Sequence, residues 1–154
     1  MRSFHLSTGQ THPYESGFLL IAEDNPADIG LIRLALMRHG IPFEIHLVSD
    51  GEAAVRFIEE VEVDDSALCP LLAILDLNLP RVSGDQVLRR LRLSVKWRLV
   101  PVVVMSSSLS VRDREQALVL GATAYFPKRS ELEQFLELGA VIKNILARNA
   151  ASNQ

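Results

Sequence analysis

Short apolar runs alternate with longer segments of helical periodicity along most of this chain. Apolar runs bounded by polar and turn-forming residues are typical of β-strands, whereas apolar residues spaced three and four apart are typical of amphipathic helices. The pattern predicts strands over residues 18–22, 43–48, 71–75, 101–105 and 123–127. It predicts helices over residues 26–39, 51–60, 84–93, 111–120 and 131–148. Because strands and helices alternate, we expect one parallel sheet with helices on both faces.

The apolar pattern also predicts the order of the strands. The first, third and fourth strands are apolar throughout, as central strands of a parallel sheet are. In the second strand Phe43, Ile45 and Leu47 alternate with polar residues, and the fifth contains Pro127, which a central strand accepts poorly. Both therefore belong at the edges. The order 2-1-3-4-5 satisfies this, and it gives a doubly wound, flavodoxin-like α/β fold whose site lies at the carboxyl ends of the strands.

Local signals place the ends of several elements. Asn25 followed by Pro26 predicts a helix start, and Ser130 with Glu133 forms a capping box that predicts the start of the last helix. The acidic stretch 59–65 is interpreted as a solvated loop beyond about residue 60. The predicted organisation is a flexible arm over residues 1–17, one domain over 18–148 and a frayed tail over 149–154.

Composition narrows the class of protein. The 154 residues are 48% hydrophobic and 23% charged, which is typical of a globular domain, and the net charge of −3 gives no basic field for nucleic acid. One cysteine, Cys69, excludes an internal disulfide. The sequence has neither the apolar segment of a signal peptide nor a run long enough to span a membrane, so we expect a cytoplasmic protein. The four histidines have no metal-ligand spacing.

Polar side chains follow four of the predicted strands, and they are the candidates for chemistry. They are Glu23 and Asp24, Asp76, Ser106, and Lys128. The carboxyl ends of parallel strands share one edge of the sheet, so these side chains converge. Crowded carboxylates repel by about 4 kcal/mol per close pair at an effective dielectric constant near 20. A cation relieves that repulsion, and oxygen ligands suit Mg²⁺; a carboxylate is also a nucleophile toward phosphoryl donors.

The motifs around these residues closely resemble the receiver domain of two-component response regulators, a CheY-like fold, over roughly residues 18–147. The matching stretches are FLLIAEDNPAD, LAILDLNLPRVSG, PVVVMSSS and GATAYFPK. The sequences of the first two stretches are most similar to those of stand-alone regulators, including the regulators that partner cyanobacterial phytochromes. The resemblance implies that Asp76 is the phosphoacceptor, that Ser106 and Lys128 contact the phosphoryl group, and that Tyr125 is an aromatic switch residue. It further implies a Mg²⁺ site made of Asp24, Asp76, the backbone carbonyl of Asn78 and, through water, Glu23.

One departure from the family lies next to Lys128. The family usually has a proline after this lysine, commonly with a cis peptide bond, whereas Arg129 follows here. A cis bond to a residue other than proline costs about 2.5–4 kcal/mol, so we expect a trans bond and a reshaped loop.

The resemblance implies a single-domain response regulator that is not an enzyme in the ordinary sense. It would receive a phosphoryl group from a sensor histidine kinase or phosphotransfer protein and signal by protein contact, with a homodimer through the fourth helix, fifth strand and fifth helix as one form of output. Because the last predicted helix ends near the end of the sequence, we expect no DNA-binding output domain. The alternative is a receiver-like interaction module that acts independently of phosphorylation. A haloacid-dehalogenase-type phosphatase would require an aspartate where Asn78 stands, and no nucleotide-binding glycine motif occurs.

Overall fold

The computed structural model describes residues 17–152 of the chain, and all but the last residue of the predicted arm 1–17 lies outside this range. The described residues form a five-stranded parallel sheet in the order β2-β1-β3-β4-β5, as the sequence predicts. Its strands are β1 (Phe18–Ala22), β2 (Glu44–Val48), β3 (Leu72–Asp76), β4 (Val102–Ser106) and β5 (Ala124–Pro127). The helices are α1 (Pro26–Arg38), α2 (Gly51–Val63), α3 (Gly84–Leu93), α4 (Val111–Val119), α5 (Leu132–Leu136) and α6 (Leu138–Ser152).

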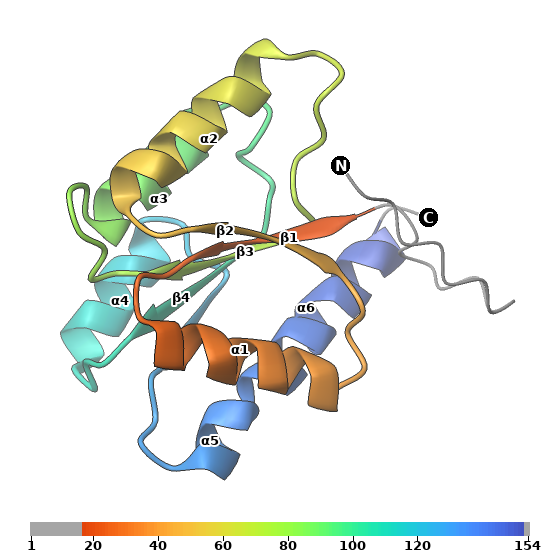
Figure 1. Ribbon diagram of the computed structural model, residues 1–154. Helices are drawn as coiled ribbons and strands as arrows, with labels where there is room; N and C mark the ends of the chain where they lie inside the picture. The colour runs from red at the N-terminus through yellow and green to blue at the C-terminus, as the bar shows by residue number, and fades with distance from the viewer. Residues whose placement is uncertain (1–16, 153–154) are drawn as a thin grey trace, which may run out of the picture.

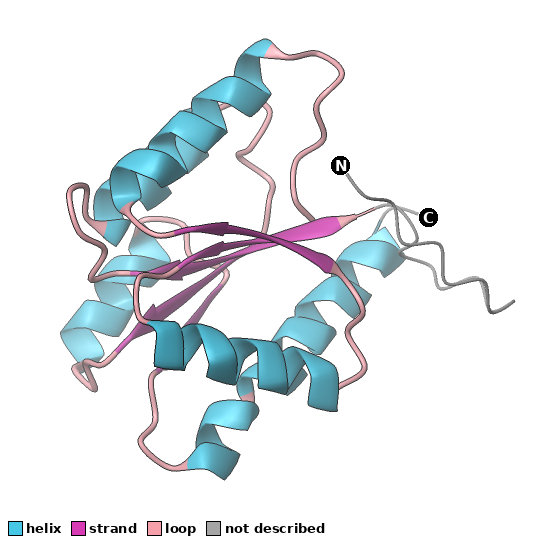
Figure 2. Cartoon of the chain, viewed as in Figure 1, coloured by secondary structure: helices cyan, strands magenta, loops and turns pink. Residues whose placement is uncertain are grey.

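Helices cover both faces of the sheet (Figures 1 and 2). Alternate residues of each central strand point to opposite faces, so Leu20 and Leu75 join one core cluster while Leu19 and Ile74 join the other. The first cluster also takes in residues of α2, α3 and α4, and the second takes in residues of α1, α5 and α6. β3 and β4 are buried along their whole length, which explains their continuous apolar sequences.

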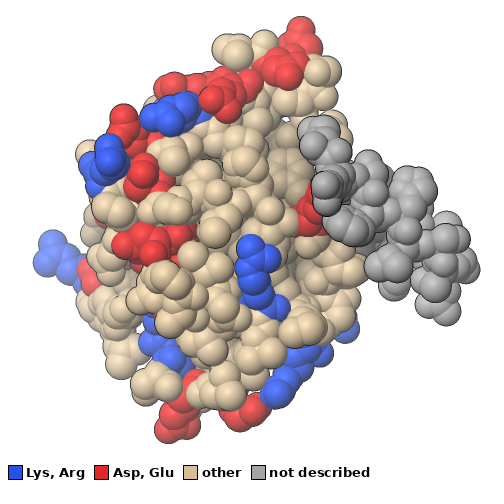
Figure 3. All heavy atoms as spheres, viewed as in Figure 1, with Lys and Arg blue, Asp and Glu red and all other residues tan. Residues whose placement is uncertain are grey.

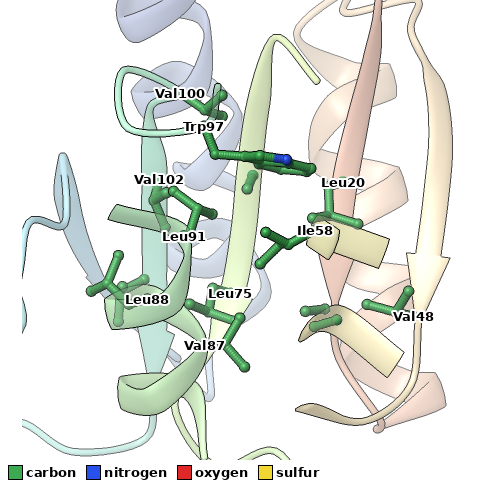
Figure 4. Packing of buried hydrophobic residues seen from close by; sticks show 14 of the residues in the cluster. Leu20, Val48, Ile58, Leu75, Val87, Leu88, Leu91, Trp97, Val100 and Val102 are labelled. Carbon is green, nitrogen blue, oxygen red and sulfur yellow. The ribbon is translucent and has the colours of Figure 1, made fainter. Parts of the chain in front are cut away.

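Trp97 anchors the first cluster, where it lies near Leu20 and Ile58 (Figure 4). It is fully buried, although it belongs to the irregular segment between α3 and β4. Its ring packs edge-on against Phe57 of α2, with the ring centroids 5.8 Å apart. Trp97 is therefore a packing residue of this core.

The prediction of a single last helix from Ser130 to residue 148 is wrong, because two helices, α5 and α6, occupy this region. The predicted capping box does not form: the N-cap of α5 is Glu131, with no side-chain hydrogen bond, and Glu133 pairs instead with Arg38 of α1. The break lets Gly139 of α6 lie against the end of α1. A Cβ at position 139 would stand 2.2 Å from Nδ1 of His39, so only glycine fits this approach.

Two helices are longer than their sequences predict. α2 continues through Val63 into the acidic stretch, because Arg90 pairs with Glu59 and Glu62, and Nζ of Lys96 donates hydrogen bonds to carbonyls at the end of the helix. α6 continues to Ser152, so the predicted boundary of a frayed tail at 149 falls inside a helix. Among the helices of residues 17–152, none has the length and apolar character needed to cross a bilayer.

Candidate functional site

The polar residues predicted to converge lie at the carboxyl edge of the sheet. Glu23 and Asp24 directly follow β1, Asp76 ends β3, Ser106 ends β4, and Lys128 directly follows β5. Figure 3 shows acidic side chains gathered along α2 and near the end of the sheet where the strands terminate. The strand pairing explains why these residues meet, because neighbouring parallel strands bring their last residues to one edge.

The loop between β1 and α1 fixes the acidic pair. Asn25 caps α1, as predicted: its Oδ1 accepts hydrogen bonds from the amides of Ala27 and Asp28, at 2.9 and 3.3 Å. Oε1 of Glu23 accepts from the amides of Asp24 and Asn25, both at 3.1 Å. Glu23 is buried, whereas Asp24 is exposed. The pair therefore combines a carboxylate held by its own loop with one that faces solvent.

The loop after β3 holds Asp76 in place. The amide of Asn78 donates to Oδ1 of Asp76 at 3.0 Å, and Asp76 itself is 3% exposed. The chain then returns closely, because the Gly84 amide that opens α3 donates to the carbonyl of Leu77 at 3.0 Å. A Cβ at position 84 would lie 2.4 Å from the carbonyl oxygen of Asp76, so this return requires glycine. The amide of Asn78 and the close return of Gly84 together set the direction of the Asp76 side chain.

Lys128 is the centre of the charge network. Its Nζ lies 2.7 Å from Oδ2 of Asp28, 2.9 Å from Oε2 of Glu23 and 3.0 Å from Oδ2 of Asp76. Its backbone amide donates to the carbonyl of Ser106 at 2.7 Å, which ties the residue to the end of β4. Burial works against the charged ammonium, but the hydrogen bonds to the three carboxylates prevail and raise the pKa of Lys128 above its ordinary value.

Asp28 is a member of this site that the sequence analysis missed. It lies in the first turn of α1, four residues beyond Asp24, and its side chain is 19% exposed. No strand ends at this position, so the argument that located the other residues could not reach it. In a sequence, an aspartate in the first turn of a helix indicates only a favourable interaction with the helix dipole.

Glu23 has the most perturbed environment of the carboxylates. Burial raises its pKa to about 7, and the neighbouring charge of Asp76 acts in the same direction, although hydrogen bonds with Lys128 and the amide of Asn25 oppose the shift. Its Oε2 is fully buried, and the ion pair with Nζ of Lys128 at 2.9 Å is the one contact found for it among the described residues. A buried oxygen in this condition is a feature of sites that accept a further ligand.

The same carboxylates fit a divalent cation. Glu23, Asp24 and Asp76 each offer an oxygen, and these oxygens lie within 4.8 Å of one another. Oxygen donors are the ligands that Mg²⁺ and Mn²⁺ prefer, and a site with few protein carboxylates leaves positions for water and phosphate. The donor set and the underused Oε2 of Glu23 therefore fit such an ion.

Ser106 and Tyr125 both contact Ser108, in the loop between β4 and α4. Oγ of Ser106 accepts a hydrogen bond from the amide of Ser108 at 3.1 Å, and the hydroxyl of Tyr125 donates to the carbonyl of Ser108 at 2.8 Å. Oγ of Ser108 in turn donates to Oδ2 of Asp113 in α4 at 2.5 Å. A continuous set of hydrogen bonds thus links the end of β4 to β5 and to the first turn of α4, through a serine that the sequence analysis did not single out.

The residue after Lys128 departs from the usual family pattern without a cis bond. No peptide bond within residues 17–152 is cis, so the bond between Lys128 and Arg129 is trans, as expected. Arg129 lines a small cavity of about 140 Å³ together with Tyr125, Leu109 and Val111. The loop after β5 therefore faces the first turn of α4.

Comparison with known proteins identifies the family. Residues 19–139 match the response regulator receiver domain. The chain belongs to this family. Its members are signalling domains of two-component systems, so the resemblance seen in the sequence and the predicted fold are confirmed.

The relatives include stand-alone regulators. The chain is 34% identical to the probable methanogenesis regulatory protein FilR2 of Methanothrix harundinacea, over 85% of this chain and 84% of that protein. It is 29% identical to the response regulator Rcp1 of Synechocystis sp., over 78% of this chain and 82% of Rcp1. The chain spans about half the length of several transcriptional regulators that it also matches.

Solved structures of the family share the fold. The crystal structure of the phosphorylated cyanobacterial phytochrome response regulator RcpA has a TM-score of 0.74 at 31% identity, covering 85% of this chain and 94% of that one. The Mn²⁺-bound form of Rcp1 has a TM-score of 0.73 at 28% identity, covering 84% and 93%. The similarity thus extends to one regulator solved with a phosphoryl group and another solved with a divalent ion.

Proposed function

We propose that this protein is a response regulator that accepts a phosphoryl group on Asp76 from a sensor histidine kinase or a phosphotransfer protein. The observation that carries this proposal is the position of Asp76 at the end of β3. Its Oδ2 is 3.0 Å from Nζ of Lys128, and it shares the edge of the sheet with Glu23 and Asp24. A carboxylate oxygen beside a positive charge is what the transfer of a phosphoryl group requires, and this supports Asp76 as the nucleophile.

The transfer breaks the P–N bond of a phosphohistidine and forms a P–O bond to a carboxylate oxygen of Asp76, while the imidazole keeps the electron pair. Lys128 neutralises oxygens of the phosphoryl group, and the hydroxyl of Ser106 donates to them. Mg²⁺ would be held by Asp24, Asp76 and the backbone carbonyl of Asn78, with Glu23 acting through water. When bound, it supplies further neutralisation of the phosphoryl oxygens. The same groups would assist dephosphorylation, in which water attacks the phosphorus, the P–O bond to Asp76 breaks, and inorganic phosphate leaves while Asp76 returns to a carboxylate.

The hydrogen bonds of Ser108 support a switch in the same residues. Where Ser106 rotates its Oγ toward a phosphoryl group, it gives up the hydrogen bond that it accepts from the amide of Ser108, which is one of two that Ser106 and Tyr125 make with the backbone of Ser108. The other bond comes from the Tyr125 hydroxyl, which would then reorient. The change reaches α4 through Asp113.

The output would be a protein contact at the surface formed by α4, β5 and the helical segment after β5, which was predicted as one fifth helix and is divided into α5 and α6. Leu109 and Val111 are 70% and 69% exposed at the start of this surface, beside the loop that Tyr125 holds. Large apolar side chains exposed side by side are typical of interaction surfaces. A homodimer is one form that this contact would take.

The test is the intact mass of the protein after incubation with acetyl phosphate and Mg²⁺. We expect one added phosphoryl group in the wild type and none in Asp76→Ala or after chelation of the metal. Circular dichroism of both proteins serves as the control for folding. A folded wild type that gains no mass and binds no Mg²⁺ would instead favour a receiver-like interaction module that acts without phosphorylation.

A further inference from the structure

Asp28 makes the shortest of the three carboxylate contacts of Lys128, yet none of the roles proposed above uses it. Its Oδ2 is 2.7 Å from Nζ, compared with 2.9 Å for Glu23 and 3.0 Å for Asp76. The contact is well shielded, because the side chains of Lys128 and Asp28 are only 14% and 19% exposed. Solvent screening is therefore weaker here than for a surface ion pair.

The position of Asp28 is fixed by the backbone. Its amide donates to Oδ1 of Asn25, which caps α1, so the residue belongs to the rigid first turn of that helix. Asp28 is consequently held beside Lys128 by a different element from those that carry the other carboxylates: Glu23 and Asp24 lie in the loop after β1, and Asp76 ends β3. It acts on the site through Lys128 and through its charge.

The charge of Asp28 affects how the site binds both a divalent cation and a phosphoryl group. With the carboxylates ionised, Glu23, Asp24, Asp28 and Asp76 surround one ammonium group, so negative charge is in large excess. Each carboxylate makes the binding of a divalent cation more favourable. Each also opposes a phosphoryl group, because an aspartyl phosphate carries about one more negative charge than the carboxylate that it replaces. Lys128 has only three N–H donors, and three carboxylates already surround them, so a phosphoryl oxygen has to displace one of these partners.

We propose that Asp28 is a positioning residue that favours the metal-bound, unphosphorylated form of the site. Its short ion pair keeps the ammonium group of Lys128 beside the carboxylates. Its negative charge attracts the divalent cation and repels the phosphoryl group. This inference rests on the proposed function of Asp76. It predicts effects of opposite sign on the two ligands when the charge of Asp28 is removed.

The test uses Asp28→Asn, which keeps the size of the side chain and an oxygen acceptor for Lys128. Calorimetric titration with Mg²⁺ alone is followed by titration with beryllium fluoride, an anionic mimic of the phosphoryl group, at saturating Mg²⁺. We expect the Kd for Mg²⁺ to rise by about three- to tenfold and the Kd for beryllium fluoride to fall by about threefold, the scale of one partly screened charge.

Glu133→Gln is the matched control. It removes one carboxylate from the first turn of another helix, where Glu133 pairs with Arg38 in an exposed position. Arg38 ends α1, ten residues and therefore about 15 Å along the helix from Asp28. Both Kd values should match those of the wild type in this variant.

If Asp28 has a purely structural role, Asp28→Asn would weaken the binding of both ligands. If its contact with Lys128 is irrelevant, neither Kd would change. Either result overturns the inference. Failure of the proposed function looks different. In that case wild-type protein takes up no phosphoryl group from acetyl phosphate, whatever residue stands at position 28. If the wild type is phosphorylated and the two Kd values of Asp28→Asn fail to move apart, only the role of Asp28 is lost.

Discussion

At the scale of single residues, Lys128 makes three buried or nearly buried carboxylates compatible with the fold. We expect Lys128→Met to lower the free energy of unfolding by about 3 kcal/mol without divalent cations, because it leaves these charges uncompensated. Mg²⁺ supplies replacement charge, so it should recover most of the loss and stabilise the variant more than the wild type. Urea unfolding with and without Mg²⁺ measures both effects.

The exposed Lys143→Met provides the control for loss of a lysine. It should unfold like the wild type in both buffers. A deficit in Lys128→Met that Mg²⁺ leaves unchanged would mean that lost packing, not lost charge, explains the destabilisation.

The residues of the site were predictable to different degrees. Asp76 and Lys128 were found because each follows an apolar strand, and parallel strands bring such positions together. Asp28 was not, because its contact with Lys128 joins positions 100 residues apart and depends on how α1 sits over the sheet. Ser108 was missed for a related reason: its contacts with Ser106 and Tyr125 are made by its backbone, to which any residue type contributes, and its hydroxyl bonds only to Asp113 and to the amide of Ser110.

At the scale of elements, Arg92 connects three segments that the sheet alone does not hold together. Its guanidinium donates to the carbonyls of Gly121, Arg98 and Val100, at distances between 2.7 and 3.0 Å. We expect Arg92→Lys to lower the free energy of unfolding by about 2 kcal/mol, because an ammonium cannot reach all three carbonyls. Urea unfolding measures this loss.

Arg89→Lys is the comparison, since Arg89 lies exposed on the same helix. It preserves charge and leaves the fork of Arg92 intact, so its stability should stay within about 0.5 kcal/mol of the wild type. Equal stability of the two variants would show that the carbonyl contacts of Arg92 contribute little.

Elements whose ends depend on local capping were predicted well, and those that depend on distant partners were not. Asn25 caps α1 as predicted, and Ser110 caps α4 in the same way, at the start of a helix whose position was predicted correctly. The end of α2 depends on Arg90 and Lys96, which come about 30 residues later. The break between α5 and α6 accompanies the close approach of Gly139 to α1, and the carboxylate of Glu133 pairs with Arg38. Neither partner is visible from the local pattern.

At the scale of the whole molecule, the strand order followed from which strands are apolar on both faces, and this placed the site at one edge of the sheet. The same topology puts β4 and β5 beside α4, so the hydrogen bonds of Ser108 join the site to an outer surface. Sequence patterns locate such a surface, but they leave its partner open, because exposed apolar residues fit many partners.

The dimer proposed for this surface leads to a prediction about Val111, the first residue of α4. We expect wild-type protein with Mg²⁺ and beryllium fluoride to shift toward the mass of a dimer in light scattering after size exclusion. Val111→Glu should remain monomeric, because it places a charge on the exposed apolar surface. The variant should still fold and still be phosphorylated, since a glutamate is favourable at the start of a helix. Val63→Glu, at the end of α2, outside this surface and 84% exposed, should dimerise like the wild type. If Val111→Glu forms as much dimer as the wild type, the interface lies elsewhere. If the wild type stays monomeric both with and without beryllium fluoride, the partner of this surface is a different protein.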